Sequence, residues 1–348
     1  MTKQASTCFT RCIFGAALAL LATLAQAAVG VTEIPGKDGD RVVTVFYPSS
    51  GQEAQVKRGP FAIQLAENGA PVRGNGRLVV ISHGSGGSVW VHGDVAKMLA
   101  EAGFIVAGPE HAGDNYRDKD KPGPDSWKRR PQEVSRAIDA VAADARFGPL
   151  LALDKVGMYG MSAGGHTALS LAGGRWSPAR LRDHCEAHLA EDFQSCVGLA
   201  TRLSGGIFDG LKKTVSMWLI RSKLDDATWY SHTDPRVAAV VAGVPFAADF
   251  DTASLAAPKM PLGLVTAQKD AWLIPRFHSD PILKACAKCE LVADFPTGGH
   301  GALLSPPPPK LDGLVGDMLN DPPGFDRAKE VPEVNRKIAA FFVQHLAR

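Results

Sequence analysis

Short apolar segments alternate with segments of helical periodicity along most of this 348-residue chain. The apolar segments have the form of strands covered on both faces, and they span residues 78–81, 104–107, 155–159, 237–244, 262–267 and 291–295. Stretches with one apolar face follow several of them, and the last of these carries Val334, Ile338 and Phe342. This alternation predicts an α/β fold with a mostly parallel central sheet and helices on both faces.

One segment, residues 175–235, does not follow the alternation. It is long, mixes polar with apolar residues and holds two cysteines. It is either an insertion that forms a cap above the sheet or a peripheral excursion without a role in binding. We therefore expect a single domain over residues 28–348 with a possible cap insertion at 175–235.

The first 27 residues have the pattern of a signal peptide. Two basic residues precede an apolar run at residues 13–24, and Ala25–Gln26–Ala27 supplies a small-x-small cleavage motif. An apolar run of this length is too short for a membrane-spanning helix, which needs about 20 residues. We expect cleavage before Ala28, location in the periplasm or the medium, and no stable membrane anchor afterwards. An uncleaved N-terminal anchor is the alternative.

Charge balance excludes a polyanion as the partner. The chain has 38 basic and 36 acidic residues, and two of the basic residues lie within residues 1–27. The remaining chain therefore has equal numbers of each, and it has no formal net charge when histidine is neutral. We expect no nucleic-acid partner.

Four cysteines remain after residue 27, namely Cys185, Cys196, Cys286 and Cys289. An even number in an exported protein indicates disulfides, and the two pairings local in sequence are the simplest. Cys286-x-x-Cys289 is also compatible with a redox motif or half of a zinc site, but no second pair of ligands accompanies it. We expect two structural disulfides and neither a metal nor an organic cofactor.

The motif Gly160-Met161-Ser162-Ala163-Gly164 follows an expected strand and precedes an expected helix. This is the context of a nucleophile elbow, in which the serine occupies a strained turn at the end of a strand. Glycines two residues away on each side leave room for that turn. The pattern predicts that Ser162 is a catalytic nucleophile.

A serine hydroxyl needs a base, and the order expected for this architecture is serine, acid, histidine. Of the late histidines, His300 follows the last expected strand in a glycine loop at the carboxyl edge of the sheet, where a base could reach Ser162. His278 and His345 lie in a polar loop and in the final helix. We expect His300 to be the base.

Three aspartates are candidates for the acid that orients His300. Asp270 follows the strand at 262–267, whereas Asp249 and Asp251 follow the preceding strand. We favour Asp270, because one strand usually separates this acid from the strand that precedes the histidine. Asp249 stays open as the alternative.

The turn His83-Gly84-Ser85-Gly86-Gly87 follows the strand at 78–81. Its glycines let the backbone approach a substrate, so we expect the backbone N–H groups of Ser85 and Ala163 to form an oxyanion hole. A phosphate-binding turn is the alternative, although the chain lacks the Gly-x-Gly-x-x-Gly pattern and the lysine of a P-loop.

These motifs resemble the α/β-hydrolase superfamily. Within it, the chain is similar to a secreted bacterial group described as predicted dienelactone hydrolases, which is related to the platelet-activating-factor acetylhydrolases. The resemblance covers most of residues 40–345 except 175–235, and it rests on residues 82–87, 109–111 and 159–165 together with Asp270 and Gly299–His300. The acetylhydrolases place their acid after an earlier strand, which is a second reason to keep Asp249 open.

The resemblance implies an exported serine hydrolase. Dienelactone hydrolases have cysteine at the position of Ser162, so we expect a serine carboxylic-ester hydrolase that forms an acyl-enzyme. Acyl transfer or amide cleavage by the same three residues is an alternative, and a catalytically inactive binding protein of the same fold is another. The sequence carries no indication of the oligomeric state.

The expected substrates are small or medium soluble esters. We find no basic amphipathic stretch that would favour an anionic lipid surface, and the 175–235 segment mixes charged residues among its apolar ones. Several of the six tryptophans lie in loops or in this segment, where they could line an acyl pocket or pack the segment against the sheet.

Overall fold

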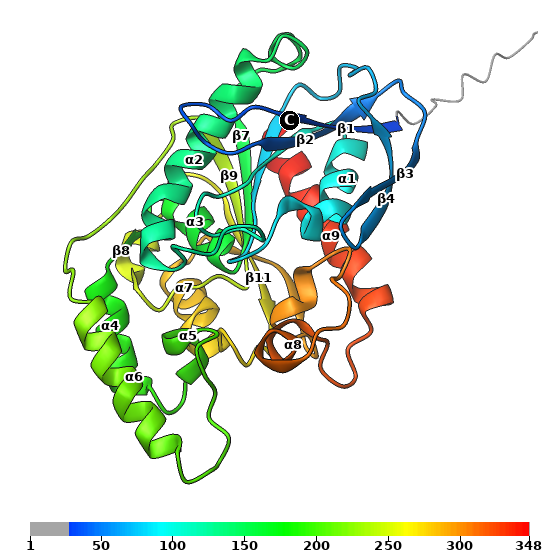
Figure 1. The fold of residues 1–348 in the computed structure, drawn as a ribbon. Helices are drawn as coiled ribbons and strands as arrows, with labels where there is room; N and C mark the ends of the chain where they lie inside the picture. The colour runs from blue at the N-terminus through cyan, green and yellow to red at the C-terminus, as the bar shows by residue number, and fades with distance from the viewer. Residues whose placement is uncertain (1–27, 348) are drawn as a thin grey trace, which may run out of the picture.

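The protein is described here by a computed structural model that covers residues 28–347. The expected signal peptide at residues 1–27 lies outside the described residues. Within residues 28–347, ten strands form one sheet (Figure 1). In spatial order they are β12 (Glu290–Phe295), β11 (Leu262–Ala267), β9 (Val237–Gly243), β7 (Val156–Met161), β5 (Leu78–Ser82), β6 (Ile105–Pro109), β2 (Val43–Ser49), β1 (Ala28–Ile34), β4 (Phe61–Glu67) and β3 (Ala54–Arg58).

The strands from β12 to β6 are all parallel, whereas β2 pairs antiparallel with both β6 and β1. The predicted α/β class with a mostly parallel sheet is therefore confirmed, and the arrangement is consistent with the fold that the resemblance implies. The strands β1, β3 and β4 were not expected. Residues 41–47 have the pattern of an outer antiparallel strand that ends before Pro48. Strand β2 instead continues through Pro48, which pairs with Val29 and accepts a hydrogen bond from the N–H of Val72 at 2.9 Å.

Helices cover both faces of the sheet and create a separate apolar core on each (Figure 1). One core packs α2 (Pro124–Ala143) and α3 (Ala163–Leu171) against alternate strand residues such as Leu78 and Val80. The other packs α1 (Gly93–Glu101) and α9 (Arg327–Leu346) against Val79 and Ile81. Strands buried on both sides explain why the parallel segments read as continuous apolar runs.

The 175–235 segment adds three helices beside the sheet. They are α4 (Pro178–His188), α5 (Phe193–Val197) and α6 (Asp209–Lys223), preceded by the short strand β8 (Arg175–Trp176), which pairs with β10 (Phe250–Asp251). Figure 1 shows α4 and α6 side by side at the edge of the molecule, with α5 closer to the sheet.

Two further helices, α7 and α8, complete the fold at Ser279–Ala285 and Gly313–Leu319. Short 3-10 turns lie at Val89–His92, Gly148–Leu150, Thr252–Leu255, Pro275–Phe277 and His300–Leu303. Within residues 28–347, no helix combines the length and apolar character needed to cross a bilayer.

Both predicted disulfides are confirmed. Cys185 in α4 is bonded to Cys196 in α5, and Cys286 is bonded to Cys289 just after α7. The first bond holds two helices of the 175–235 segment together, while the second closes a short turn.

The expectation that the chain lacks a basic amphipathic stretch is wrong. Helix α6 contains four basic residues and one acidic residue, and it exposes Leu211, Val215 and Trp218 on one side. The apolar spacing is visible in the sequence. The direction in which those side chains point depends on how α6 packs on α4, and this was not predictable from the segment alone.

Candidate active site

Ser162 lies at the sharp turn between β7 and α3, with backbone angles φ = 59° and ψ = −118°. A positive φ is strained for a residue other than glycine. Gly160 and Gly164 are required because any larger residue would clash with the backbone at this turn. A Cβ atom on Gly160 would lie 2.0 Å from the carbonyl oxygen of Gly164, and one on Gly164 would lie 1.9 Å from that of Ser82. The predicted elbow geometry is therefore present.

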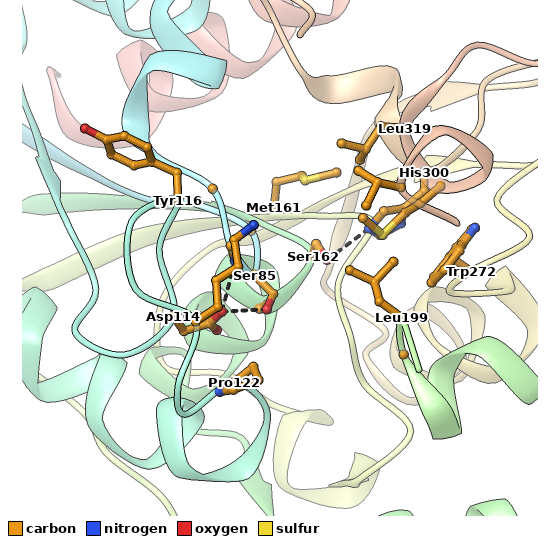
Figure 2. A pocket seen from close by; sticks show the side chains of 18 of the residues that line it. Ser85, Asp114, Tyr116, Pro122, Met161, Ser162, Leu199, Trp272, His300 and Leu319 are labelled. Carbon is orange, nitrogen blue, oxygen red and sulfur yellow. Dashed lines mark hydrogen bonds between the residues drawn. The ribbon is translucent and has the colours of Figure 1, made fainter. Parts of the chain in front are cut away.

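The structure brings together Ser162, His300 and Asp270 from the carboxyl ends of three parallel strands. His300 Nε2 lies 3.0 Å from Ser162 Oγ (Figure 2). The Nδ1 atom of His300 lies 2.7 Å from Asp270 Oδ2. Asp270 Oδ1 in turn accepts hydrogen bonds from the N–H groups of Trp272 and Leu273, at 2.8 Å each. With Nδ1–H donating to the carboxylate, Nε2 is free to accept the proton of the serine hydroxyl.

The other candidate residues do not contact Ser162 or His300. Asp249 Oδ2 lies 3.0 Å from His166 Nε2, and Asp251 pairs with Arg175 at the surface. His278 Nδ1 accepts a hydrogen bond from a backbone N–H at 3.0 Å, and His345 lies 3.0 Å from Glu290. Of the three aspartates considered, Asp270 is the one that contacts His300.

The turn at residues 83–87 lies against the nucleophile. A Cβ atom on Gly84 would lie 3.5 Å from Ser162 Cβ, and Ser85 and Ala163 line the same cavity as Ser162. Ala163 is the first residue of α3, so its N–H has no partner within the helix. The Ser85 hydroxyl donates a hydrogen bond to Asp114 Oδ1 at 2.6 Å, and Asp114 lines the same cavity (Figure 2).

A buried ion pair beneath this turn was not predicted. Arg130 Nη2 donates to Asp114 Oδ2 at 2.8 Å, and Arg130 Nη1 donates to the carbonyl oxygen of His83 at 2.5 Å. Asp114 Oδ1 also accepts the N–H of Gly86 at 2.9 Å. Asp114 and Arg130 thus hold the turn from both ends. They come from a loop and from α2, and no local motif links them.

The electrostatics of this ion pair favour a charged carboxylate. Burial acts to raise the pKa of Asp114, but the Arg130 charge and the hydrogen bonds from Ser85 and Gly86 outweigh it and keep that pKa below its ordinary value. Both partners are almost fully buried. Removing one of them would leave the other as an uncompensated buried charge.

Next to the ion pair, a second buried chain of polar groups supports the end of β5. Ser82 Oγ lies 2.7 Å from His111 Nε2, and His111 Nδ1 lies 2.6 Å from Glu133 Oε2. His83 Nδ1 donates to the carbonyl oxygen of Gly84 at 2.8 Å. Burial lowers the pKa of His111 and of His83, which favours their neutral forms. The histidines near the turn are therefore structural hydrogen-bonding groups in this arrangement.

A cavity of about 1220 Å³ opens above Ser162. The 175–235 segment forms part of its wall, with Leu181 and Leu199 among the lining residues, so this segment is not confined to the periphery. Trp272 and Leu319 lie on the His300 side (Figure 2). Of the six tryptophans, Trp90, Trp127 and Trp272 line the cavity.

A cluster of histidine, cysteine or carboxylate side chains that could hold a metal ion is absent from the part of the chain that the structure describes. Comparison of the sequence with protein-family models and with curated proteins found no match. The fold and site define an α/β protein with a serine, a histidine and an aspartate in hydrogen-bonded series. Any assignment of function rests on this geometry and on the motifs.

Proposed function

We propose that the protein is an exported serine carboxylic-ester hydrolase of the α/β-hydrolase superfamily. The observation that carries the proposal is the hydrogen-bonded series from Ser162 through His300 to Asp270, with the serine at a strained strand-to-helix turn. This is the arrangement in which a histidine can remove the hydroxyl proton as the serine attacks a carbonyl.

In the proposed reaction, Ser162 Oγ bonds to the ester carbonyl carbon while His300 Nε2 takes the hydroxyl proton. Asp270 orients the imidazole and stabilises its cationic form. The N–H groups of Ala163 and Ser85 stabilise the negative oxygen of the tetrahedral intermediate. His300 then returns the proton to the departing alcohol as the ester C–O bond breaks. Water, deprotonated by His300, then attacks the acyl carbon. The bond between that carbon and Ser162 Oγ breaks, His300 returns the proton to Oγ, and the acid is released.

The proposed substrates are small or medium esters, with acyl chains of about two to eight carbons. The apolar side chains near His300, such as Trp272 and Leu319, are compatible with an apolar acyl chain (Figure 2). A series of nitrophenyl esters of increasing chain length, assayed on the wild type and on Ser162→Ala, tests this. Strong activation on emulsified long-chain triglyceride with weak turnover of soluble butyrate esters would contradict it.

A fluorophosphonate probe separates an enzyme from an inactive binding protein of the same fold. The probe bonds to a serine that an adjacent base activates, so we expect labelling of Ser162 and none of Ser162→Ala. A wild type that is not labelled would favour the binding protein. Amide cleavage or acyl transfer would use the same three residues, and assays with matched amide substrates or added alcohols distinguish them.

Location outside the cytoplasm is part of the proposal. Two disulfides support an oxidising compartment, and the pattern in residues 1–27 supports export. Mass spectrometry of the exported protein should find Ala28 at the N-terminus. Retention of Met1 would contradict this.

A further inference from the structure

Helix α6 turns an apolar side toward solvent. Among residues 28–347, twelve large apolar side chains are strongly exposed, and half of them belong to one short segment. We call these six the α6 apolar face, and they are Ile207, Phe208, Leu211, Val215, Trp218 and Leu219. Leu211 is 62% exposed and Trp218 is 68% exposed. The spacing of three and four residues places the helical members on one side.

The orientation of α6 is the reverse of an ordinary surface helix. Its buried positions are Ser216 and Ile220, on the side that faces away from Leu211. The helix packs against α4, and Arg221 pairs with Glu186 of α4 at 2.7 Å. A surface helix normally buries its most apolar side. Here the contacts with α4 keep the larger apolar side in water, and exposure of this kind marks an interaction surface.

Cations border the α6 apolar face on both sides. At 100° per residue, Lys212 and Lys223 fall along one border and Arg221 along the other. Lys212 pairs with Asp209 at 3.1 Å and Arg221 pairs with Glu186, whereas Lys223 has no ion pair among the described residues. The helix carries four basic residues and one acidic residue, although the chain from Ala28 onward is balanced. A face of tryptophan, phenylalanine and leucine with basic residues at its borders is the pattern of a helix that lies in a lipid interface.

We propose that the α6 apolar face binds the surface of an anionic phospholipid bilayer and holds the protein there reversibly. A second copy of this chain is the less favourable occupant. A twofold interface places the same patch on both copies, and it would bring the cations at the borders close to one another. Anionic headgroups are instead attracted by the excess of basic over acidic residues in the helix while the apolar side chains leave water. The inference does not depend on the reaction at Ser162.

The chain segment that leads into α6 begins at a wall of the cavity. Leu199 lines the cavity, and the chain runs from there directly to Ile207. Between them, Arg202 forms an ion pair with Asp317 of α8, another element of the cavity wall.

Co-sedimentation with vesicles tests the proposal, using the protein that begins at Ala28. We expect binding to vesicles of phosphatidylglycerol and phosphatidylcholine in equal parts, and much weaker binding to pure phosphatidylcholine. Salt should weaken it, because the Debye length falls from about 10 Å at 0.1 M to about 3 Å at 1 M. Leu211→Ser and Trp218→Ser should each lower the partition coefficient of the protein into the anionic vesicles about ten-fold or more. Each variant lacks one large apolar side chain that would leave water on binding.

Leu291→Ser is the matched control. Leu291 is 54% exposed on the edge strand β12, outside the α6 apolar face, so its replacement should leave binding unchanged. Lys223→Glu provides a second test, because it reverses a charge and removes no apolar side chain. It should weaken binding to the anionic vesicles and leave binding to pure phosphatidylcholine vesicles unchanged. Leu211 and Trp218 do not line the cavity, so turnover of a soluble ester and the melting temperature should stay at wild-type values.

Three results would overturn the proposal. One is a wild type that binds neither kind of vesicle. Another is equal binding by the wild type, Leu211→Ser and Lys223→Glu. The third is a wild-type dimer in analytical ultracentrifugation that Trp218→Ser converts to a monomer, because the face would then be an interface between copies.

Discussion

The carboxylate of Asp249 lies 3.0 Å from Nε2 of His166, and both side chains are fully buried. The imidazole of His166 stacks on Trp127 and meets Trp176 edge-on. His166 lies one helical turn after Ser162 in α3. The pair therefore supports the helix that follows the nucleophile, and it takes Asp249 away from His300.

This pairing predicts opposite outcomes for the two aspartates. Asp270→Asn should lower kcat about 10⁴-fold, as in serine proteases, because the amide no longer holds the required tautomer of His300. Asp249→Asn should leave kcat within about ten-fold and instead reduce stability by about 1–3 kcal/mol, the usual cost of an impaired buried hydrogen bond. Ester turnover and urea unfolding measure the two effects. If Asp249→Asn were the crippling change, the acid would have been misassigned.

Asp114 is expected to act as a positioning residue for the turn at Ser85. Asp114→Asn should lower kcat with little change in KM, because an N–H donor that shifts away from the oxyanion loses stabilisation made in the transition state. The loss of kcat should be at least about ten-fold. It should stay below the 10²–10³-fold loss that follows when one such donor is removed completely. Steady-state kinetics on a butyrate ester provide the measurement.

Asp118→Asn is the control for that prediction. Asp118 lies on the same loop, and its carboxylate pairs with Arg41 at 2.9 Å and accepts the N–H of Gly113 at 3.0 Å, but it forms no hydrogen bond with Ser85, Gly86 or Arg130. Its replacement should leave kcat unchanged. An equal loss of kcat in both variants would indicate a general effect on the loop.

The two disulfides should differ in their contribution to stability. Cys185–Cys196 spans eleven residues and Cys286–Cys289 spans three, so the chain-entropy model assigns about 3 and about 2 kcal/mol to them. Cys185→Ala should therefore lower the melting temperature more than Cys286→Ala does. Alkylation without reduction should find no free thiol at the four positions. An unchanged melting temperature in Cys185→Ala would count against a structural role.

His92 should make stability fall in mildly acidic solution. Burial lowers its pKa from 6.5 to about 4, and its ring lies edge-on to Tyr159. Between these pH values the unfolded chain binds a proton that the folded chain does not. The free energy of unfolding should then drop by about 1.4 kcal/mol per pH unit as the pH falls through this window. Above pH 6.5, the stability that His92 contributes should be fully present. Urea unfolding at several pH values should show a shallower dependence in His92→Gln.

Much of the fold was predictable from local pattern. The parallel strands were found because burial on both faces leaves a continuous apolar run, and β11 was predicted to the residue. Strands β3 and β4 were missed because exposed polar residues interrupt both strands, so that neither forms such a run.

The sequence by itself determined the elbow around Ser162, the order of serine, aspartate and histidine, and the local cysteine pairs. These features depend on steric needs and spacings within a few residues. The tertiary structure decided that Asp270 and not Asp249 contacts His300, that Arg130 lies beneath the turn at Ser85, and that α6 exposes Trp218. Each of these is a contact or an orientation set by packing between elements far apart in the chain, and no local pattern encodes it.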